Sequence, residues 1–507
     1  MLFLEFRPIT RGRLRRSRVS FWLLTLAALA LYAATALDYA FPGASATWIA
    51  WAAGLDVREV PSHPLLMWAA GHVVRLPWLS LPLRLNLMAA VAGALAVGWT
   101  FKVVWFVVFE AMREESAVTH ASRNARFAGW VAALAVGLSL PVWQAATRFQ
   151  PQIFDVALLM ACAHLLTVYA RSKRTVWLLF FGLLYGAGMA ESPLFLVALP
   201  VMAVFAVVVE WKLEWCRVGR LFGTAVLAAL ALAGVHAFAA RQFVLSRGLE
   251  VTLQAMLHVT VSVLREQAQA IGQMFPEHLW FPVFVLGLGS AALSFFAALR
   301  SLDNRRSWSA FILSLVLTIF ALLLLFNVPF GPWGVVAKAG VVPAATYLIA
   351  GIGIALLTAS WRALALLDDP VDVEIPFDKE DDDEPPLPHP LARSTTILFN
   401  AGRGVGLMAM PILVVAILVA GVLNVRWLVA DNGAFADRAA DEVLDGLGQR
   451  DWVVANGIID ANLLIRARER GQTVHLLCPY RARETHYTDA VRRTFTADTR
   501  FSERARL

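Results

Sequence analysis

Cysteine and charge are both scarce in this sequence. Only three of the 507 residues are cysteine and only 16% are Asp, Glu, Lys or Arg, whereas 59% are hydrophobic. Three cysteines cannot form the disulfide framework that stabilises small secreted domains. So little charge also argues against a soluble globular protein and is typical of chains that cross a membrane several times. We therefore expect an all-α polytopic membrane protein.

The net charge of +7 is explained by where the basic residues lie. Lys and Arg gather in residues 1–20 and between apolar runs, at 110–126, 171–174, 211–220 and 300–307. Loops that stay in the cytoplasm retain such charge during insertion. The pattern predicts a cytoplasmic N-terminus and an outside C-terminus, in what we expect to be a bacterial inner membrane, and it argues against nucleic acid as a partner. A cleaved signal peptide is the alternative explanation of the basic N-terminus.

Apolar segments of about twenty residues, the length that crosses a bilayer, recur along the chain. We identify eleven of them, at 21–37, 85–109, 127–143, 153–170, 175–190, 193–210, 221–238, 279–299, 308–326, 341–361 and 405–425. Several are short, so 127–143 and 175–210 can also be paired or re-entrant segments. The helical stretch 249–275 contains three charges that lipid would not tolerate, so it is predicted to lie on the membrane or over the first loop.

These segments divide the chain into five parts. They are a basic cytoplasmic N-terminus (1–20), a membrane domain (21–361) with an outer loop (38–84), an acidic, proline-rich cytoplasmic linker (362–404), a last span (405–425) and a small extracytoplasmic α/β domain (426–507). In the last part we expect strands at 452–457 and 473–478, a helix between them and another at 488–496. Two strands do not complete a doubly wound sheet, so this domain packs on the membrane portion or is completed by another subunit.

The loop 38–84 is too rich in proline to cross a bilayer, and its tryptophans favour a membrane interface, so we expect a folded loop with short helices that lie on the membrane. The stretch 38–87 contains, in this order, Pro42, Gly43, Ser45, Gly54, Pro61, Pro64, Leu65, Leu76, Pro77, Arg84 and Asn86. This order resembles the first outer loop of GT-C-type membrane glycosyltransferases, in the family that includes the transmembrane protein 260-like protein O-mannosyltransferases. The resemblance implies a GT-C-like membrane domain that transfers a sugar from a polyprenyl phosphate at the outer membrane face.

The acids of that family's first loop are missing here. Ala44 and Thr47 stand where the family has Asp and Glu, and Glu59 lies near a family histidine position. Gln152 stands in place of the glutamate of the family's E-x-Y, and Glu191 opens the stretch that corresponds to its N-H motif. A carboxylate is needed in such an enzyme to accept the proton of the acceptor hydroxyl or to hold a divalent cation.

Other residues near these positions are candidates for the site. The catalytic candidates are Asp38, Glu59 and Glu191, and the substrate-binding candidates are Arg84, His63, Asn86 and Arg148. Arg84 suits a lipid phosphate because its planar fork matches phosphate oxygens. Asp56 and Asp155 are further acids in this region, and for each acid the alternative is a hydrated carboxylate at a helix end. No residue is assigned as a metal ligand and the cofactor is unknown, although a divalent cation is compatible with an active enzyme.

Two functions of different classes follow from these features. The first is a GT-C-like glycosyltransferase that uses a polyprenyl-phosphate sugar. The second is a catalytically degenerate GT-C scaffold that binds a lipid-linked substrate or a protein partner. The expected partners are membrane lipid, a polyprenyl-phosphate sugar and another membrane or periplasmic subunit. A carboxylate in the place of the missing acids would favour the first function.

Overall fold

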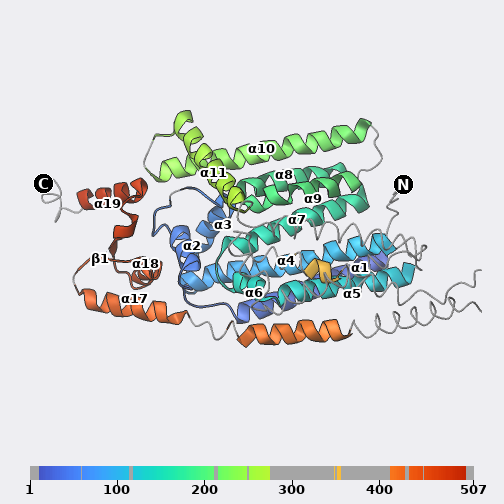
Figure 1. The fold of residues 1–507 in the computed structure, drawn as a ribbon, viewed down its shortest axis with the longest axis horizontal. Coiled ribbons are helices and arrows are strands. Elements are labelled where there is room, and N and C mark those ends of the chain that lie inside the picture. The colour runs from blue at the N-terminus through green and yellow to red at the C-terminus, as the bar shows by residue number, and fades with distance from the viewer. Residues whose placement is uncertain are drawn as a thin grey trace, which may run out of the picture.

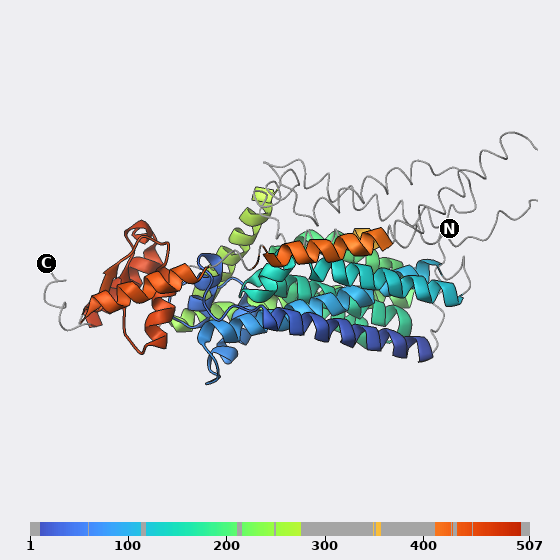
Figure 2. The ribbon, with the colours of Figure 1, turned by 90° about the horizontal axis from the view of Figure 1, so that it is seen from below.

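The computed structural model describes residues 11–58, 60–112, 118–209, 215–247, 250–274, 348, 351–355, 411–426, 428, 433–448 and 450–497. This part of the chain is mostly helical and forms an elongated bundle with a smaller C-terminal unit (residues 433–497) at one end (Figure 1). The bundle helices are α1 (Arg11–Ala34), α4 (Leu81–Met112), α5 (Val118–Gly137), α6 (Leu140–Thr147), α7 (Pro151–Ser172), α8 (Thr175–Glu191), α9 (Pro193–Val209) and α10 (Trp215–Ser246). Helix α11 (Leu253–Met274) leaves the bundle at an angle (Figure 2).

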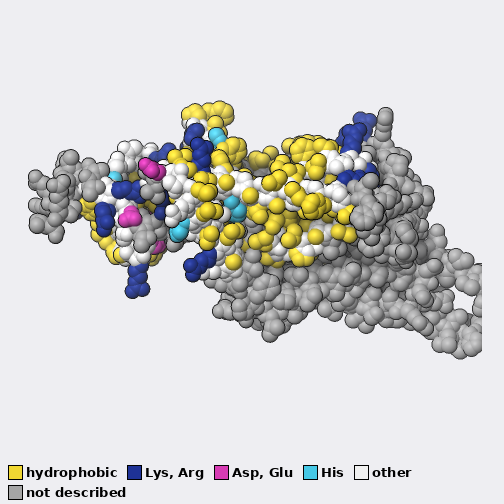
Figure 3. All heavy atoms as spheres, turned by 90° about the horizontal axis from the view of Figure 1, so that it is seen from above, with side chains coloured by type: hydrophobic (Ala, Val, Ile, Leu, Met, Phe, Trp, Pro, Cys, Tyr) yellow, Lys and Arg dark blue, Asp and Glu magenta, His cyan; other side chains and the backbone are white. Residues whose placement is uncertain are grey.

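Four described helices are long and apolar enough to cross a membrane, and a bent pair makes a fifth candidate. The four are Arg15–Ala34, Leu81–Glu110, Pro151–Ser172 and Val218–Ser246. Hydrophobic side chains cover much of the bundle's visible surface, as expected where lipid is the solvent (Figure 3). The protein is thus a helical membrane protein. The predicted segments 279–299 and 308–326 lie outside the described residues, so the arrangement with eleven spans stays a prediction.

The predicted segment 127–143 is divided between two helices. Helices α5 and α6 meet at an angle of 64°. Ser139, between them, has an extended backbone, and Pro141 lies in the first turn of α6. A proline is tolerated at a helix start but interrupts a continuous helix, which explains why the bend falls here. Two spans are also longer than predicted, since α4 begins at Leu81 and α10 reaches Ser246.

Helices α8 and α10 approach each other through glycine. A Cβ atom at Gly182 would lie 2.6 Å from the carbonyl oxygen of Thr224, and one at Gly186 would clash with the backbone of Ala228. Two small residues four positions apart on one helix face let a neighbouring backbone come into contact, a common arrangement in membrane bundles. This contact fixes α8, whose last residue is Glu191.

The first loop (residues 38–80) contains two short helices, as its prolines and tryptophans together predict. They are α2 (Ala44–Ala52) and α3 (Pro64–Val74). Ile49 of α2 and Leu66 of α3 share a small core with Leu85 of α4 and Phe149 of the α6–α7 turn. Ile465, far along the chain, belongs to the same core. The loop is therefore folded against the end of the bundle.

The C-terminal unit contains α17 (Ala434–Leu447), β1 (Trp452–Val454), α18 (Asp460–Glu469), β2 (His475–Leu477) and α19 (Thr485–Ala497). The two strands pair in parallel, with Trp452 opposite His475, and α18 connects them. Helix α17 was not among the expected elements. Its signal in the sequence is the apolar series Ala436, Ala440 and Leu444, which repeats every four residues and is buried.

This unit packs on the first loop, with α18 against α2. The polar contacts are Asn462 Nδ2 to the Ala40 carbonyl at 2.7 Å, Arg468 Nη1 to the Ala53 carbonyl at 2.8 Å and Arg481 Nη1 to Asp56 Oδ1 at 2.9 Å. The first loop is thus enclosed between the bundle and the C-terminal unit.

Candidate functional site

The site begins with an unusual helix start in the first loop. His63 precedes α3 and has a left-handed backbone, with φ of 51°. Pro64 is the first residue of the helix and has no N–H to donate. The amides of Leu65 and Leu66 are consequently the first donors of α3, and they need an acceptor from elsewhere because His63 forms no side-chain cap.

Glu191 supplies that acceptor from the end of α8. One carboxylate oxygen accepts the amide of Leu65 at 2.7 Å and the other accepts the amide of Leu66 at 2.9 Å. Only 4% of Glu191 is exposed. A carboxylate at a helix N-terminus satisfies orphan donors and interacts favourably with the helix dipole. Glu191 therefore fixes the first loop to the bundle.

Asp155, in the first turns of α7, completes a buried cluster with His63 and Glu191. His63 Nδ1 lies 3.6 Å from Asp155 Oδ1 and 3.8 Å from Glu191 Oε1. These separations are ion-pair distances, longer than a hydrogen bond. The Asp155 side chain is 2% exposed and that of His63 is 15% exposed. His63 is accordingly the most exposed member of the cluster.

The charges around His63 determine its protonation. Burial lowers the pKa of the imidazole, but the charges of Asp155, Glu191 and Glu266 raise it, and the net shift is upward. The ring of Trp48 stands edge-on to the imidazole at 5.2 Å between centroids. His63 thus carries a proton over a wider pH range than a free imidazole, and when neutral it is a strong proton acceptor.

Helix α11 also reaches this cluster. The Gln267 amide nitrogen lies 3.4 Å from the carbonyl oxygens of Met189 and Ala190, in the last turn of α8. The neighbouring Glu266 contributes to the field at His63. The predicted segment 249–275 therefore lies over the α8 end of the site.

Among the predicted catalytic residues, only Glu191 belongs to this cluster. Asp38 is exposed, and its carbonyl accepts the Ser80 hydroxyl at 3.1 Å. Glu59 lies outside the described residues. Asp155 was recognised in the sequence as a nearby acid, but its pairing with His63 depends on how α7 packs against the first loop.

The predicted substrate-binding residues other than His63 are engaged in holding the fold. Arg84 Nη1 donates to the carbonyls of Val74, the last residue of α3, and of Leu76, two residues beyond it. Asn86 is fully buried; its Nδ2 donates to the Leu37 carbonyl at 2.8 Å and its Oδ1 accepts the Phe149 amide at 2.7 Å. The Arg148 guanidinium stacks on Phe41, 3.4 Å from the ring centre. A role of these side chains in substrate binding stays a prediction.

The two positions without the expected acids lie in the first turn of α2. Ala44 is exposed, and the Thr47 hydroxyl donates to the Gly43 carbonyl at 3.1 Å. Within the described ranges, no three His, Cys, Asp or Glu side chains are grouped as metal ligands. The proton acceptor that can be identified here is the His63–Asp155 pair.

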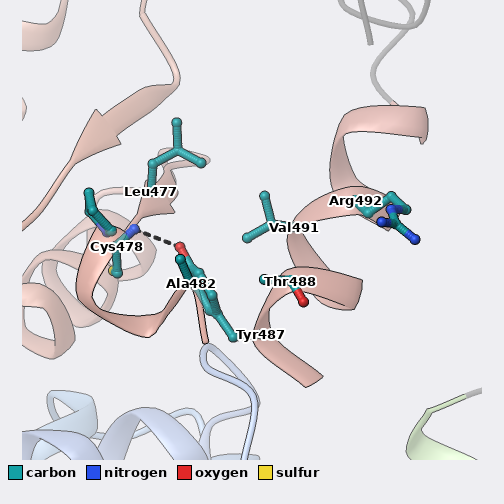
Figure 4. Close-up of a pocket in the computed structure, with 8 residues that line it drawn as sticks. Leu477, Cys478, Ala482, Tyr487, Thr488, Val491 and Arg492 are labelled. Atoms are coloured by element: carbon teal, nitrogen blue, oxygen red, sulfur yellow. Dashed lines mark hydrogen bonds between the residues drawn. The ribbon is translucent and has the colours of Figure 1, made fainter. Parts of the chain in front are cut away.

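A cavity of about 340 Å³ lies elsewhere, between the end of β2 and α19 (Figure 4). Its lining is mostly apolar and comprises Leu477, Cys478, Pro479, Ala482, Tyr487, Thr488, Val491 and Arg492. At its wall, the Cys478 amide donates to the Tyr487 hydroxyl at 2.6 Å. The lining contains no carboxylate and no histidine, and its titratable side chains are Cys478 and Tyr487 among the uncharged residues.

Comparison with known families gives one match within this region. The family model of the protein O-mannosyl-transferase TMEM260 N-terminal domain matches residues 45–215. That stretch includes α2 from its second residue, all of α3 and all three members of the His63–Asp155–Glu191 cluster. No curated protein matches the chain. From residue 45 to 215, this helical membrane protein is therefore similar to a family of O-mannosyltransferase-like glycosyltransferases.

Proposed function

We propose that the chain is a GT-C-like membrane glycosyltransferase that uses a polyprenyl-phosphate sugar at the outer membrane face. The observation that carries this proposal is the buried His63–Asp155 pair beside Glu191. It lies within the stretch that resembles the O-mannosyltransferases, and it offers a proton acceptor although Ala44 and Thr47 do not.

The reaction needs one proton transfer and one substitution. The acceptor hydroxyl gives its proton to neutral His63 Nε2 as its oxygen forms a bond to the anomeric carbon. The bond from that carbon to the phosphate oxygen breaks, and the polyprenyl phosphate leaves with the electron pair. Asp155 stabilises the imidazolium that results, as a carboxylate does behind other catalytic histidines. Glu191 holds α3 so that His63 stays in place.

Burial supports this division of roles. Both oxygens of Glu191 accept amides of α3, so this residue acts as a positioning residue rather than as the base. Asp155 is nearly inaccessible, whereas His63 is partly exposed. Asp38 and Glu59 stay predicted alternatives for the base, and the test below includes them.

Activity is tested with the purified full chain in lipid nanodiscs, polyprenyl-phosphate sugars and a Ser/Thr-containing peptide. His63→Gln and Asp155→Asn are each expected to lower transfer about 10²- to 10⁴-fold, the usual contribution of general-base catalysis. His72→Gln is the matched control, because His72 lies on α3, which His63 directly precedes, and is exposed. Transfer should increase with pH and reach half its maximum above pH about 6.5, since the base must be neutral and its pKa is raised.

Other results would redirect the proposal. Activity that survives in His63→Gln but disappears in Asp38→Asn or Glu59→Gln would assign the base to that residue. Wild-type protein without transfer from any polyprenyl-phosphate sugar would favour the second function, a degenerate scaffold that binds a lipid-linked substrate or another membrane or periplasmic subunit. The observation in favour of that function is the pair Ala44 and Thr47 in the first turn of α2.

A further inference from the structure

The small sheet of the C-terminal unit has an edge that no other strand of the described residues covers, since β1 and β2 pair only with each other there. The His475 amide and the Leu477 carbonyl form hydrogen bonds toward β1, at 2.7 and 2.9 Å. Successive residues of a paired strand direct their backbone groups to opposite sides. Leu476 and Cys478, which alternate with these two, therefore present their backbone groups on the side away from β1, which we call the β2 edge.

A single hydroxyl binds the β2 edge. The Tyr487 O–H donates to the Leu476 carbonyl at 3.0 Å, and the Cys478 amide donates to the Tyr487 hydroxyl oxygen at 2.6 Å. In a parallel pair of strands, one residue of the neighbouring strand bonds two such groups with its own N–H and C=O. Tyr487, from α19, thus takes the place that one residue of a third parallel strand would fill.

The cavity of about 340 Å³ lies beside the β2 edge (Figure 4). Cys478 and Tyr487 both line it, and Val491 points into it from α19. Its volume falls within the range of ligand pockets, about 300 Å³ and above. Because its lining is mostly apolar, it can accept an apolar side chain of a segment whose backbone pairs with β2.

The β2 edge is also connected to the first loop. Arg481 lies two residues after Pro479, which lines the cavity. Its guanidinium is 4.7 Å from the centre of the Tyr487 ring and 2.9 Å from a carboxylate oxygen of Asp56. Asp56 belongs to the loop that contains His63, the proposed base. A polypeptide bound at the β2 edge would therefore lie next to residues that contact the proposed catalytic loop.

We propose that the β2 edge binds an extended segment of the acceptor polypeptide, which displaces the Tyr487 hydroxyl and places an apolar side chain in the cavity. Addition of a strand to a sheet edge is a recurring way to bind peptides, because main-chain hydrogen bonds give affinity and side-chain pockets give specificity. The groups that Tyr487 holds are one donor and one acceptor at strand spacing, which a polypeptide backbone matches and a lipid does not. That this polypeptide is the acceptor rests on the proposed function.

Binding is measured without transfer, with the full chain in lipid nanodiscs and a fluorescent peptide that alternates valine and threonine. Tyr487→Phe removes the competing hydroxyl and should raise the affinity about 2- to 10-fold, the factor for one net hydrogen bond. If Tyr487 only stabilises the unit, binding is unchanged or weaker in this variant. Tyr480→Phe is the matched control, because Tyr480 is exposed and its hydroxyl binds Asp460.

A second variant fills the cavity. Val491→Trp should weaken binding of the same peptide at least about 10-fold, the loss expected when one apolar side chain can no longer be buried. Asp489→Trp is its control, since Asp489 is exposed on the same helix and does not line the cavity. Equal binding by the two variants would overturn the role of the cavity.

Two modified peptides test the backbone pairing with wild-type protein. One carries N-methyl groups on its valines and the other on its threonines. Their affinities should differ at least about 10-fold, because only one of the two sets of N–H groups faces the β2 edge. Equal affinities would overturn strand addition, and this comparison decides if Tyr487→Phe does not fold. A dimer of the chain that Val491→Trp dissociates in native mass spectrometry would assign the edge to a second copy and overturn the acceptor.

Failure of this inference and failure of the proposed function give different results. Peptide binding at the β2 edge without sugar transfer supports the edge but contradicts the enzyme, and with it the peptide's role as acceptor. Sugar transfer with the same peptide KM in wild type, Tyr487→Phe and Val491→Trp supports the enzyme and contradicts the edge.

Discussion

The contacts that hold the helix bundle together differ from those that attach the C-terminal unit (residues 433–497), which forms a cap over the first loop. In the bundle, α8 meets α10 backbone to backbone at Gly182 and Gly186. At the cap, the C-terminal unit touches the loop through side chains that donate to carbonyls or pair with Asp56. Closely packed helices cannot loosen gradually, because even one added methylene group disturbs their packing. Polar contacts at a surface can be exchanged for water, so we expect the cap to open before the bundle does.

The largest effect is expected from overfilling the bundle. Gly186→Leu forces a side chain into the backbone of Ala228 and should lower stability by at least about 3 kcal/mol or prevent folding. Gly223→Leu on α10 is the control, because a Cβ there meets nothing within 4 Å. Thermal unfolding and size-exclusion chromatography in detergent measure both. Equal behaviour of the two variants would show that α8 and α10 do not pack as described.

The second effect concerns the connection between the bundle and the loop. Glu191→Ala leaves the amides of Leu65 and Leu66 without their acceptor and should cost about 2 to 4 kcal/mol, since both bonds involve a buried charged group. Hydrogen exchange at α3 should increase while exchange in α4 stays slow. Unchanged protection of α3 would contradict a capping role for Glu191.

A smaller effect is expected at the cap. Asn462→Ala removes the bond to the Ala40 carbonyl and a second bond to Asp437 within the unit, and it should weaken the C-terminal unit and its docking by about 1 to 2 kcal/mol. Limited proteolysis between residues 433 and 497 should then become faster, with the melting of the bundle unchanged. Asn456→Ala, at an exposed turn of the same unit, is the control. A fall in bundle stability would mean that the two regions unfold together.

The smallest effect is a dependence of stability on pH. The pKa of His63 is raised in the folded protein by Asp155, Glu191 and Glu266 against the effect of burial, so protonation stabilises the fold. This contribution is complete below the unfolded pKa of about 6.5 and disappears as the pH rises through the higher folded pKa. The difference in unfolding temperature between wild type and His63→Gln should therefore shrink as the pH rises above about 6.5. A constant difference would contradict the ion pairs.

The parts of the site that are local in sequence were predictable, and those that depend on packing were not. The prolines and tryptophans of the loop indicated its short helices, and Glu191 was among the catalytic candidates because it lies between two apolar segments. The pairing of His63 with Asp155 joins residues 92 positions apart by their numbers. It follows from how α7 lies against the loop, which no short pattern encodes. The roles predicted for Arg84 and Arg148 illustrate the same limit. Backbone carbonyls bind Arg84 and an aromatic ring stacks on Arg148, and neither kind of partner can be recognised from a sequence motif.

The hydrogen bonds from the start of α3 to Glu191 also bear on the order of events during synthesis. Leu65 and Glu191 are separated by 126 positions. Helix α3 has only 11 residues, too few to be stable alone in water. The loop leaves the ribosome first, but it cannot be completed until the helices from α4 to α8 have been made and α8 has been inserted. A chain whose synthesis stops before residue 191 would lack this acceptor, so the start of α3 and the position of His63 would stay unfixed.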